Sequence, residues 1–243
     1  MKFSQAQWQG SRSRQEDACT VCSGDGETLL LVCDGMGGHA AGDVAAYTAM
    51  EVFRKAYVRG KRSPVSDRLK HALEEANEAV GRMLRKRKEF GGTTLAAACM
   101  GGGLLWWLSV GDSPLFLWRR RRLIRLNADH SMRAQADEEY RRGDLSYLEY
   151  LQERSYLTSA LTGETIEKVD LSPIPYFLLP GDRVILGTDG LEPCLNAASQ
   201  PLDDVARILD SGAGDAASSL IAYLRMMGHP VYDNISVIIA DPF

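Results

Sequence analysis

The sequence is poor in histidine and has no long apolar run. It contains 4 histidines among 243 residues, which leaves little provision for imidazole chemistry. No segment approaches the roughly 18 consecutive apolar residues that a membrane-spanning helix needs, so no membrane span is expected. The opening stretch, MKFSQAQWQGSRSRQED, lacks the apolar core of a signal peptide. We therefore expect a cytoplasmic protein.

Several catalytic motifs are also missing. No cysteine is followed six positions later by an arginine, which excludes the phosphate-binding loop of cysteine phosphatases. There is neither a GxSxG serine nor a GxxxxGK[ST] loop. An aspartyl-phosphate hydrolase would need a second acid two positions after Asp34, where Met36 stands. These absences argue against the catalytic mechanisms that depend on those particular motifs.

Cysteine is sparse and odd in number. Five cysteines in a chain without an export signal indicate free thiols in a reducing compartment. Cys19 and Cys22 have CxxC spacing, but no second pair is present to complete a zinc site. We interpret this stretch as a strand with alternating small residues, with metal or redox use as the alternative.

The overall charge disfavours polyanionic partners. The net charge is -4 and the pI is about 5.6, so we expect neither nucleic acid nor an acidic membrane surface as a partner. Basic residues cluster at 85–88 and 119–122. The second cluster is either a solvated hairpin tip or a feature that attracts an acidic, phosphorylated partner. With no linker and no repeat, residues 1–243 are predicted to form one domain and a monomer.

Helical patterns come in pairs and strand patterns in hairpin runs. Apolar spacing predicts a helix over 39–58, with a stripe of Val44, Tyr47, Val52, Phe53 and Tyr57. It predicts a second helix over 63–88, with Ser66 as its cap. Strand-like segments are joined by turns at Gly101–Gly103 and at the arginine cluster. This order favours an α+β fold of antiparallel sheets covered by helices.

Four strand-like segments begin or end at an aspartate. These are Asp34, Asp112, Asp189 and Asp233, each beside glycine or asparagine. A carboxylate at such a place costs several kcal/mol to desolvate unless it is paired or bound to metal. Oxygen ligands of this kind suit magnesium or manganese. The alternative is that each aspartate caps a turn.

A mixed cluster of charges lies near the start of the chain. Arg12 stands four and five positions before Glu16 and Asp17. Beside a metal site, the planar fork of an arginine matches two oxygens of a phosphate. Taken alone, the cluster is typical of a solvated loop.

Together these segments resemble the metal-dependent serine/threonine protein phosphatases of type 2C, in particular bacterial members. The similar segments run in order along nearly the whole chain: SRSRQED, LVCDGMGGHAAG, GGTTLAAA, VGDS, NADHS, YLTSALTG, LGTDGL and DNIS.

The resemblance implies a four-layer α-β-β-α sandwich of two antiparallel sheets flanked by helices, with a short flap at about 131–156. It also implies two manganese or magnesium ions and a direct attack on phosphoserine or phosphothreonine by a water that bridges them. The implied ligands are Asp34 for both ions, Asp189 and Asp233 for one, and Glu16 with the Gly35 carbonyl for the other.

Three further roles follow from the same resemblance. Asp17 would bind a metal directly or orient a water on it, and Asp112 would help to hold a third, weaker ion. Arg12 would bind the substrate phosphate. Phosphorylated proteins, in particular a serine/threonine kinase and its substrates, are the implied partners.

Two departures from the family pattern bear on mechanism. Met36 stands where many eukaryotic members have a histidine that protonates the leaving group, and Gln15 replaces an asparagine. A water on the metal is then the expected proton donor, with His39 as a less favoured alternative, and Asp129 and His130 are expected to fix a loop. A non-catalytic phosphoprotein-binding regulator and a hydrolase of small phosphate esters stay as alternative functions.

Overall fold

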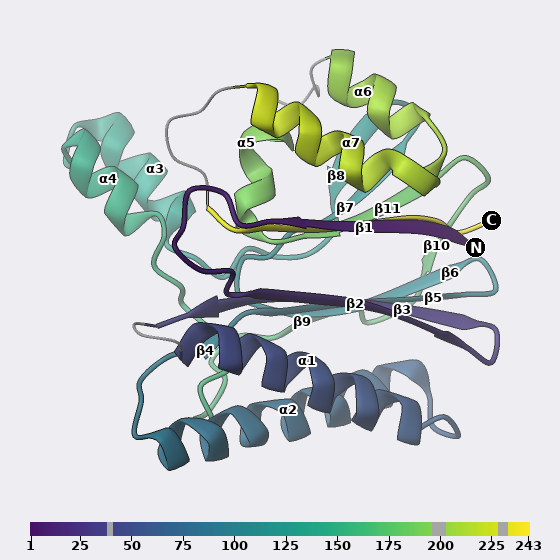
Figure 1. The fold of residues 1–243 in the computed structure, drawn as a ribbon, viewed down its shortest axis with the longest axis horizontal. Coiled ribbons are helices and arrows are strands. Elements are labelled where there is room, and N and C mark those ends of the chain that lie inside the picture. The colour runs from purple at the N-terminus through teal and green to yellow at the C-terminus, as the bar shows by residue number, and fades with distance from the viewer. Residues whose placement is uncertain (38–40, 196–202, 228–232) are drawn as a thin grey trace.

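Two antiparallel β-sheets lie face to face, and helices cover both outer faces (Figure 1). The computed structural model describes residues 1–37, 41–195, 203–227 and 233–243. The chain thus forms the predicted α-β-β-α sandwich. Within the described ranges, no helix combines the length and the apolar character needed to cross a membrane.

The first sheet has five strands, and in it the first and last strands of the chain pair along their whole length. In spatial order its strands are β1 (Lys2–Trp8), β12 (Ile235–Asp241), β11 (Arg183–Gly187), β7 (Leu115–Arg119) and β8 (Arg122–Arg125).

The second sheet has seven strands. Its main path is β10 (Tyr176–Phe177), β6 (Leu104–Val110), β5 (Leu95–Gly101), β3 (Glu27–Met36) and β2 (Asp17–Gly24), with β4 (Gly92–Thr93) paired to β3 and β9 (Asp170–Leu171) paired to β6.

Helices cover the sandwich from both sides. The second sheet carries α1 (Ala41–Arg59) and α2 (Val65–Arg87), and the first carries α5 (Glu192–Leu195), α6 (Asp203–Asp210) and α7 (Ala213–Met226) (Figure 1). A 3-10 turn, η1 (Asp189–Leu191), precedes α5. Two short helices, α3 (Arg133–Arg142) and α4 (Tyr147–Glu153), project from one end of the sandwich (Figure 1).

The alternation of side chains along the strands divides the core into three layers. One lies under α1 and α2, one under α6 and α7, and one between the sheets. Within β3, Leu30 and Val32 face the other sheet, whereas Leu29 and Leu31 face the helices. Residues 29–33 are therefore all buried, which explains why the sequence is continuously apolar here.

The predicted helices form, with two corrections. The side chain of Tyr47 is 60% exposed, so it does not belong to the buried stripe of α1, which consists of alanines together with Met50, Phe53 and Tyr57. The second helix begins at Val65, with Pro64 as its N-cap residue, so Ser66 does not cap it. Proline fixes a φ suited to the start of a helix, and that moves the boundary before the serine.

The CxxC cysteines lie on opposite faces of β2. Cys19 packs against the layer between the sheets, and Cys22 packs against the layer under α1 and α2. Both are free thiols. Because residues three apart in a strand point to opposite faces, these sulfurs cannot form one metal or redox site.

Ion pairs hold part of the arginine turn between β7 and β8. Arg119 donates to both carboxylate oxygens of Asp182, and Arg121 pairs with Asp210. Arg120 and Arg121 have positive φ angles, of 51° and 59°, as a tight hairpin turn requires. Two of the four guanidinium groups are thus engaged within the fold.

Candidate metal centre

The strand-end aspartates gather at one end of the sandwich. Pairing of β2 with β3 sets Asp17 directly opposite Asp34. In the other sheet, Asp189 directly follows Thr188 at the end of β11, and Asp233 lies just before β12, the strand beside it. Asp112 follows β6. In antiparallel neighbours the end of one strand lies beside the start of the next, which brings sequence-distant acids to one edge.

Two threonines fix the backbone of Asp34. The Asp34 amide donates to Thr94 Oγ1 at 2.9 Å, and Thr93 Oγ1 donates to the Asp34 carbonyl at 2.9 Å. The Thr94 amide donates to the same carbonyl at 2.8 Å. Both backbone groups of Asp34 are thus satisfied, so the main chain holds this residue in place at the acidic edge.

Asp17 is buried, with one carboxylate oxygen unpaired. Its Oδ2 accepts hydrogen bonds from the hydroxyls of Thr188 and Ser236, each at 2.9 Å. Its Oδ1 is buried without a hydrogen-bond partner. Burial raises the pKa of Asp17 to about 7, helped by the charges of Asp189 and Asp233 and opposed by the two hydroxyls. An orphaned buried carboxylate oxygen beside other acids is an environment that a cation would satisfy.

Mutual repulsion among the acids acts in the same direction. Burial raises the pKa of Asp34 well above its usual range, and the charges of Asp17 and Asp189 raise it further. Burial also raises the pKa of Asp189, an effect that the neighbouring Asp233 strengthens and a hydrogen bond from Asp34 opposes. Strongly perturbed acids clustered at a surface edge are typical of functional sites.

Glu16 and Gly35 lie at a close backbone contact. The Gly35 amide donates to the Glu16 carbonyl at 3.1 Å. A Cβ at Gly35 would lie 2.2 Å from the carbonyl oxygen of Gly42, so a side chain cannot fit there. Burial raises the pKa of Glu16, and Asp43 adds to the effect. The glycine therefore allows β3 and the start of α1 to lie close to each other at the acidic edge.

Arg12 reaches the same edge from the loop between β1 and β2. Its Nη2 donates to Asp233 Oδ2 at 2.5 Å, and its side chain is 56% exposed. Asn234 anchors the loop, because its Nδ2 donates to the carbonyls of Gln9 and Arg14 and its Oδ1 accepts from the Glu16 amide. Arg12 is therefore held beside the acids with its guanidinium open to solvent.

The donor set fits hard divalent cations. Magnesium and manganese prefer oxygen ligands. The acids that offer such oxygens are Asp17, Asp34, Asp189, Asp233 and Glu16. Among the described residues, no three histidine, cysteine, aspartate or glutamate side chains are arranged as a finished metal cage. Asp233 instead pairs with Arg12, and the charges of neighbouring acids raise the pKa values of Asp17, Asp34 and Asp189.

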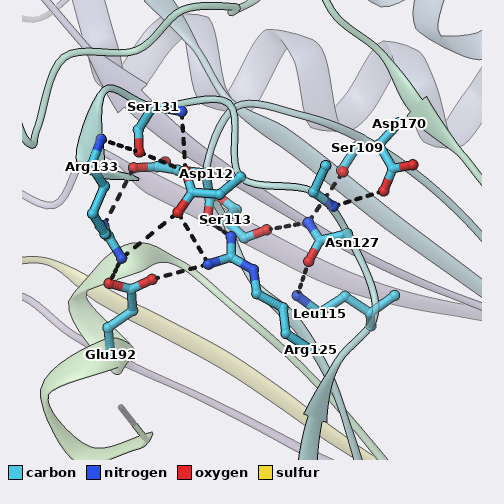
Figure 2. Close-up of polar contacts among 12 residues, drawn as sticks. Ser109, Asp112, Ser113, Leu115, Arg125, Asn127, Ser131, Arg133, Asp170 and Glu192 are labelled. Atoms are coloured by element: carbon cyan, nitrogen blue, oxygen red, sulfur yellow. Dashed lines mark hydrogen bonds and ion pairs between the residues drawn. The ribbon is translucent and has the colours of Figure 1, made fainter. Parts of the chain in front are cut away.

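Asp112 has a different environment from the other acids. Arg133 Nη2 lies 3.9 Å from its Oδ2, and Arg125 Nη2 donates to its backbone carbonyl at 2.8 Å (Figure 2). Both arginines also pair with Glu192. Burial and the nearby Asp189 raise the pKa of Asp112 to about 7, while Arg133 lowers it. A third ion at Asp112 therefore fits less well than ions beside Asp17 and Asp34.

His130 and Asp129 make hydrogen bonds that hold their own loop. His130 is buried, and its Nδ1 accepts from the Gly111 amide at 3.3 Å. Asp129 accepts from the amide and hydroxyl of Ser131. These contacts confirm both as loop-fixing residues. Gln15 Oε1 accepts from the Asp17 amide, and His39 lies outside the described residues.

The prediction omitted the residues that support the acids. Thr94, Thr188 and Asn234 lie within quoted motifs, so their sequence signal was present, but their roles depend on partners in other strands. Arg133 and Glu192 carried no recognisable pattern. They are brought together because α3 starts beside the turn after β11 (Figure 2).

Known proteins share both sequence and fold with this chain. It is 26% identical over 225 residues to the serine/threonine phosphatase stp of Listeria monocytogenes, covering 89% of this chain and 85% of that protein. Its structure matches that of the Mycobacterium tuberculosis serine/threonine phosphatase PstP/Ppp with a TM-score of 0.78 and 26% identity, over 99% and 97% of the two chains.

A further solved structure carries metal. The catalytic domain of the phosphatase PstP, in complex with two manganese ions, matches with a TM-score of 0.74 and 25% identity over 99% of this chain and 97% of that chain. The family model described as protein phosphatase 2C matches residues 8–225. The acids therefore gather at the strand ends of a shared architecture, and the chain belongs to the protein phosphatase 2C family, as its motifs predict.

Proposed function

We propose that this protein is a metal-dependent phosphatase that hydrolyses phosphoserine and phosphothreonine in proteins. The observation that carries the proposal is the pairing of the buried Asp17 with the half-buried Asp34 on adjacent strands, with the unpaired Oδ1 of Asp17 beside further acids. Family membership and the names of the relatives support the same reaction.

Five acids would hold two manganese or magnesium ions. Asp34 would contact both ions, Asp189 and Asp233 one, and Glu16 with the Gly35 carbonyl the other. Asp17 would bind a metal directly or orient a water on it. The two manganese ions of the related PstP catalytic domain support this number. When bound, such ions make water a nucleophile at neutral pH and neutralise charge on the transferring phosphoryl group.

The chain's own residues position the substrate. Arg12 is exposed and can turn its fork from Asp233 to a phosphate, which binds more strongly to a bidentate donor. Asn234 and the loop 9–16 hold that arginine in place. The side chain at position 36 is a thioether and cannot donate a proton, so we expect water to protonate the leaving oxygen, with His39 as the less favoured alternative.

The partners are phosphorylated proteins. A serine/threonine kinase and its substrates are the specific partners that we propose, by analogy with the family. The flap at 131–156 contains α3 and α4, and its base is closed by a bridge between Ser131 and Leu157. Its role in choosing substrates, the single domain over residues 1–243, the monomeric state and the cytoplasmic location stay predictions.

Phosphate release from a phosphothreonine peptide tests the proposal. It would be measured with manganese, with magnesium and with excess chelator, for the wild type, for Asp189→Asn and for Asp203→Asn. Asp203 is an exposed acid at the start of α6 and serves as the matched control. We expect metal-dependent release that is lost in Asp189→Asn and retained in Asp203→Asn.

The same assay separates the alternative functions. Metal binding without release from any peptide or small ester would overturn the enzyme assignment in favour of a phosphoprotein-binding regulator. A kcat/KM for 4-nitrophenyl phosphate above that for every phosphopeptide would favour a small-ester hydrolase.

A further inference from the structure

Asp112 lies against positive charge supplied by the chain itself. Its side chain is 5% exposed and that of Arg133 is 15% exposed, so their 3.9 Å approach is largely shielded from water. Arg125 adds a second guanidinium through its 2.8 Å hydrogen bond to the Asp112 carbonyl. This acid therefore differs from Asp17, whose hydrogen-bond donors are neutral hydroxyls.

A buried glutamate holds Arg133 in this position. Glu192 is the first residue of α5, its side chain is 8% exposed, and it forms an ion pair with Arg133. Arg125 pairs with the same glutamate at 3.4 Å and with Asp129 at 3.2 Å. Figure 2 shows both arginines reaching between Asp112 and Glu192. The network fixes the guanidinium from two sides, and arginine cannot lose its charge in response.

We infer that the Arg133 guanidinium is a built-in cation that takes the place of a third metal ion beside Asp112. The inference rests on the proposed function for the two core ions. A divalent ion bound to Asp112 would lie close to a fixed positive charge in a poorly solvated place, where like charges repel strongly. Because Arg133 is the first residue of α3, the same contact ties the base of the flap to the acidic edge.

Manganese stoichiometry tests the inference without reference to activity. Bound manganese would be counted by calorimetric titration and by elemental analysis after equilibrium dialysis, on the full chain. We expect two ions for the wild type, two for Arg133→Lys, three for Arg133→Met and two for Arg133→Met with Asp112→Asn. Circular dichroism would check that each variant is folded.

A second measurement does not depend on the Arg133 variants. Asp112→Asn removes the carboxylate that a third ion would need, so the inference expects the count to stay at two. Three ions in the wild type, a fall from three to two in Asp112→Asn, or two ions in folded Arg133→Met would each overturn it.

The phosphopeptide assay keeps this result separate from the proposed function. A wild type that binds three ions and releases phosphate refutes the inference alone. A wild type that binds two ions and releases no phosphate from any substrate refutes the proposed function.

Discussion

Replacing Asp17 by asparagine should stabilise the metal-free protein while removing its activity. The substitution keeps the shape of the side chain and an oxygen that can accept from Thr188 and Ser236. It removes a charge that the fold buries beside other acids. A rise in pKa from 3.8 to about 7 corresponds to a penalty of roughly 4 kcal/mol at pH values above 7.

The sign of the pH dependence follows from the raised pKa. The folded protein holds the proton of the Asp17 carboxyl group more tightly than the unfolded chain does. The stability that this proton contributes is therefore fully present below the unfolded pKa and is lost as the pH rises through the folded pKa. For Asp17 the folded pKa is about 7. Between pH 5 and pH 8, the metal-free wild type should therefore lose roughly 2 to 3 kcal/mol more stability than Asp17→Asn.

Urea unfolding in the presence of chelator measures both quantities. The free energy of unfolding would be obtained at several pH values for the wild type, for Asp17→Asn and for Asp203→Asn, whose carboxylate is exposed. Parallel pH profiles for the wild type and Asp17→Asn would refute the reasoning, because they would mean that Asp17 titrates alike in the folded and unfolded chains.

Three other perturbations have defined outcomes. Arg12→Lys keeps the charge but loses the fork, so KM for a phosphopeptide should rise about tenfold, whereas the exposed Arg14→Lys should leave it unchanged; equal effects would remove Arg12 from phosphate binding. Gly35→Ala places a Cβ 2.2 Å from the Gly42 carbonyl oxygen, so it should lower the free energy of unfolding by about 3 kcal/mol and weaken metal binding measured by calorimetry. Gly24→Ala has open space around its Cβ and should change neither quantity. Gly214→Ala in α7 should raise the free energy of unfolding in urea by about 1 kcal/mol, because alanine favours the helix and nothing lies near its Cβ. Gly81→Ala in α2 should lower it, because the new Cβ would lie 2.5 Å from the Gly163 Cα. A gain in both variants would contradict the steric argument for Gly81.

Sequence patterns predict this fold well where one physical rule dominates. The β3 segment is recognisable because both faces of its strand are buried, and α2 because its apolar stripe recurs at helical spacing. For α1 the rule fails. Large side chains suggest Tyr47 as a core residue, yet the close packing of α1 uses alanines, which hydrophobicity alone does not mark as an interface.

The candidate site follows the same division. Asp34 and Asp189 can be predicted as candidates because an acid at the end of an apolar run is costly to bury without a partner. The supports of Asp17 could not be assigned, although Thr188 and Ser236 lie in the LGTDGL and DNIS motifs, because the carboxylate that they contact lies on a strand of the other sheet. Arg133 and Glu192 lie in polar segments, where the sequence does not distinguish a buried charged residue from an exposed one. Their importance arises from burial, which charge patterns along a chain do not reveal.

The two sides of the acidic edge therefore balance their charge by different means. Beside Asp112 the fold supplies fixed guanidinium groups, anchored by Glu192 and nearly closed to water. Beside Asp17 and Asp34 the neighbours are hydroxyls and further acids, and Arg12 at this side pairs with Asp233, so the charge of Asp17 still raises the pKa of Asp34. Binding energy for a divalent ion is greatest where such repulsion between carboxylates is relieved. The metal ions that we propose would therefore bind at the side where Asp17 and Asp34 lie opposite each other on β2 and β3, next to Arg12, which is exposed and could receive the substrate phosphate.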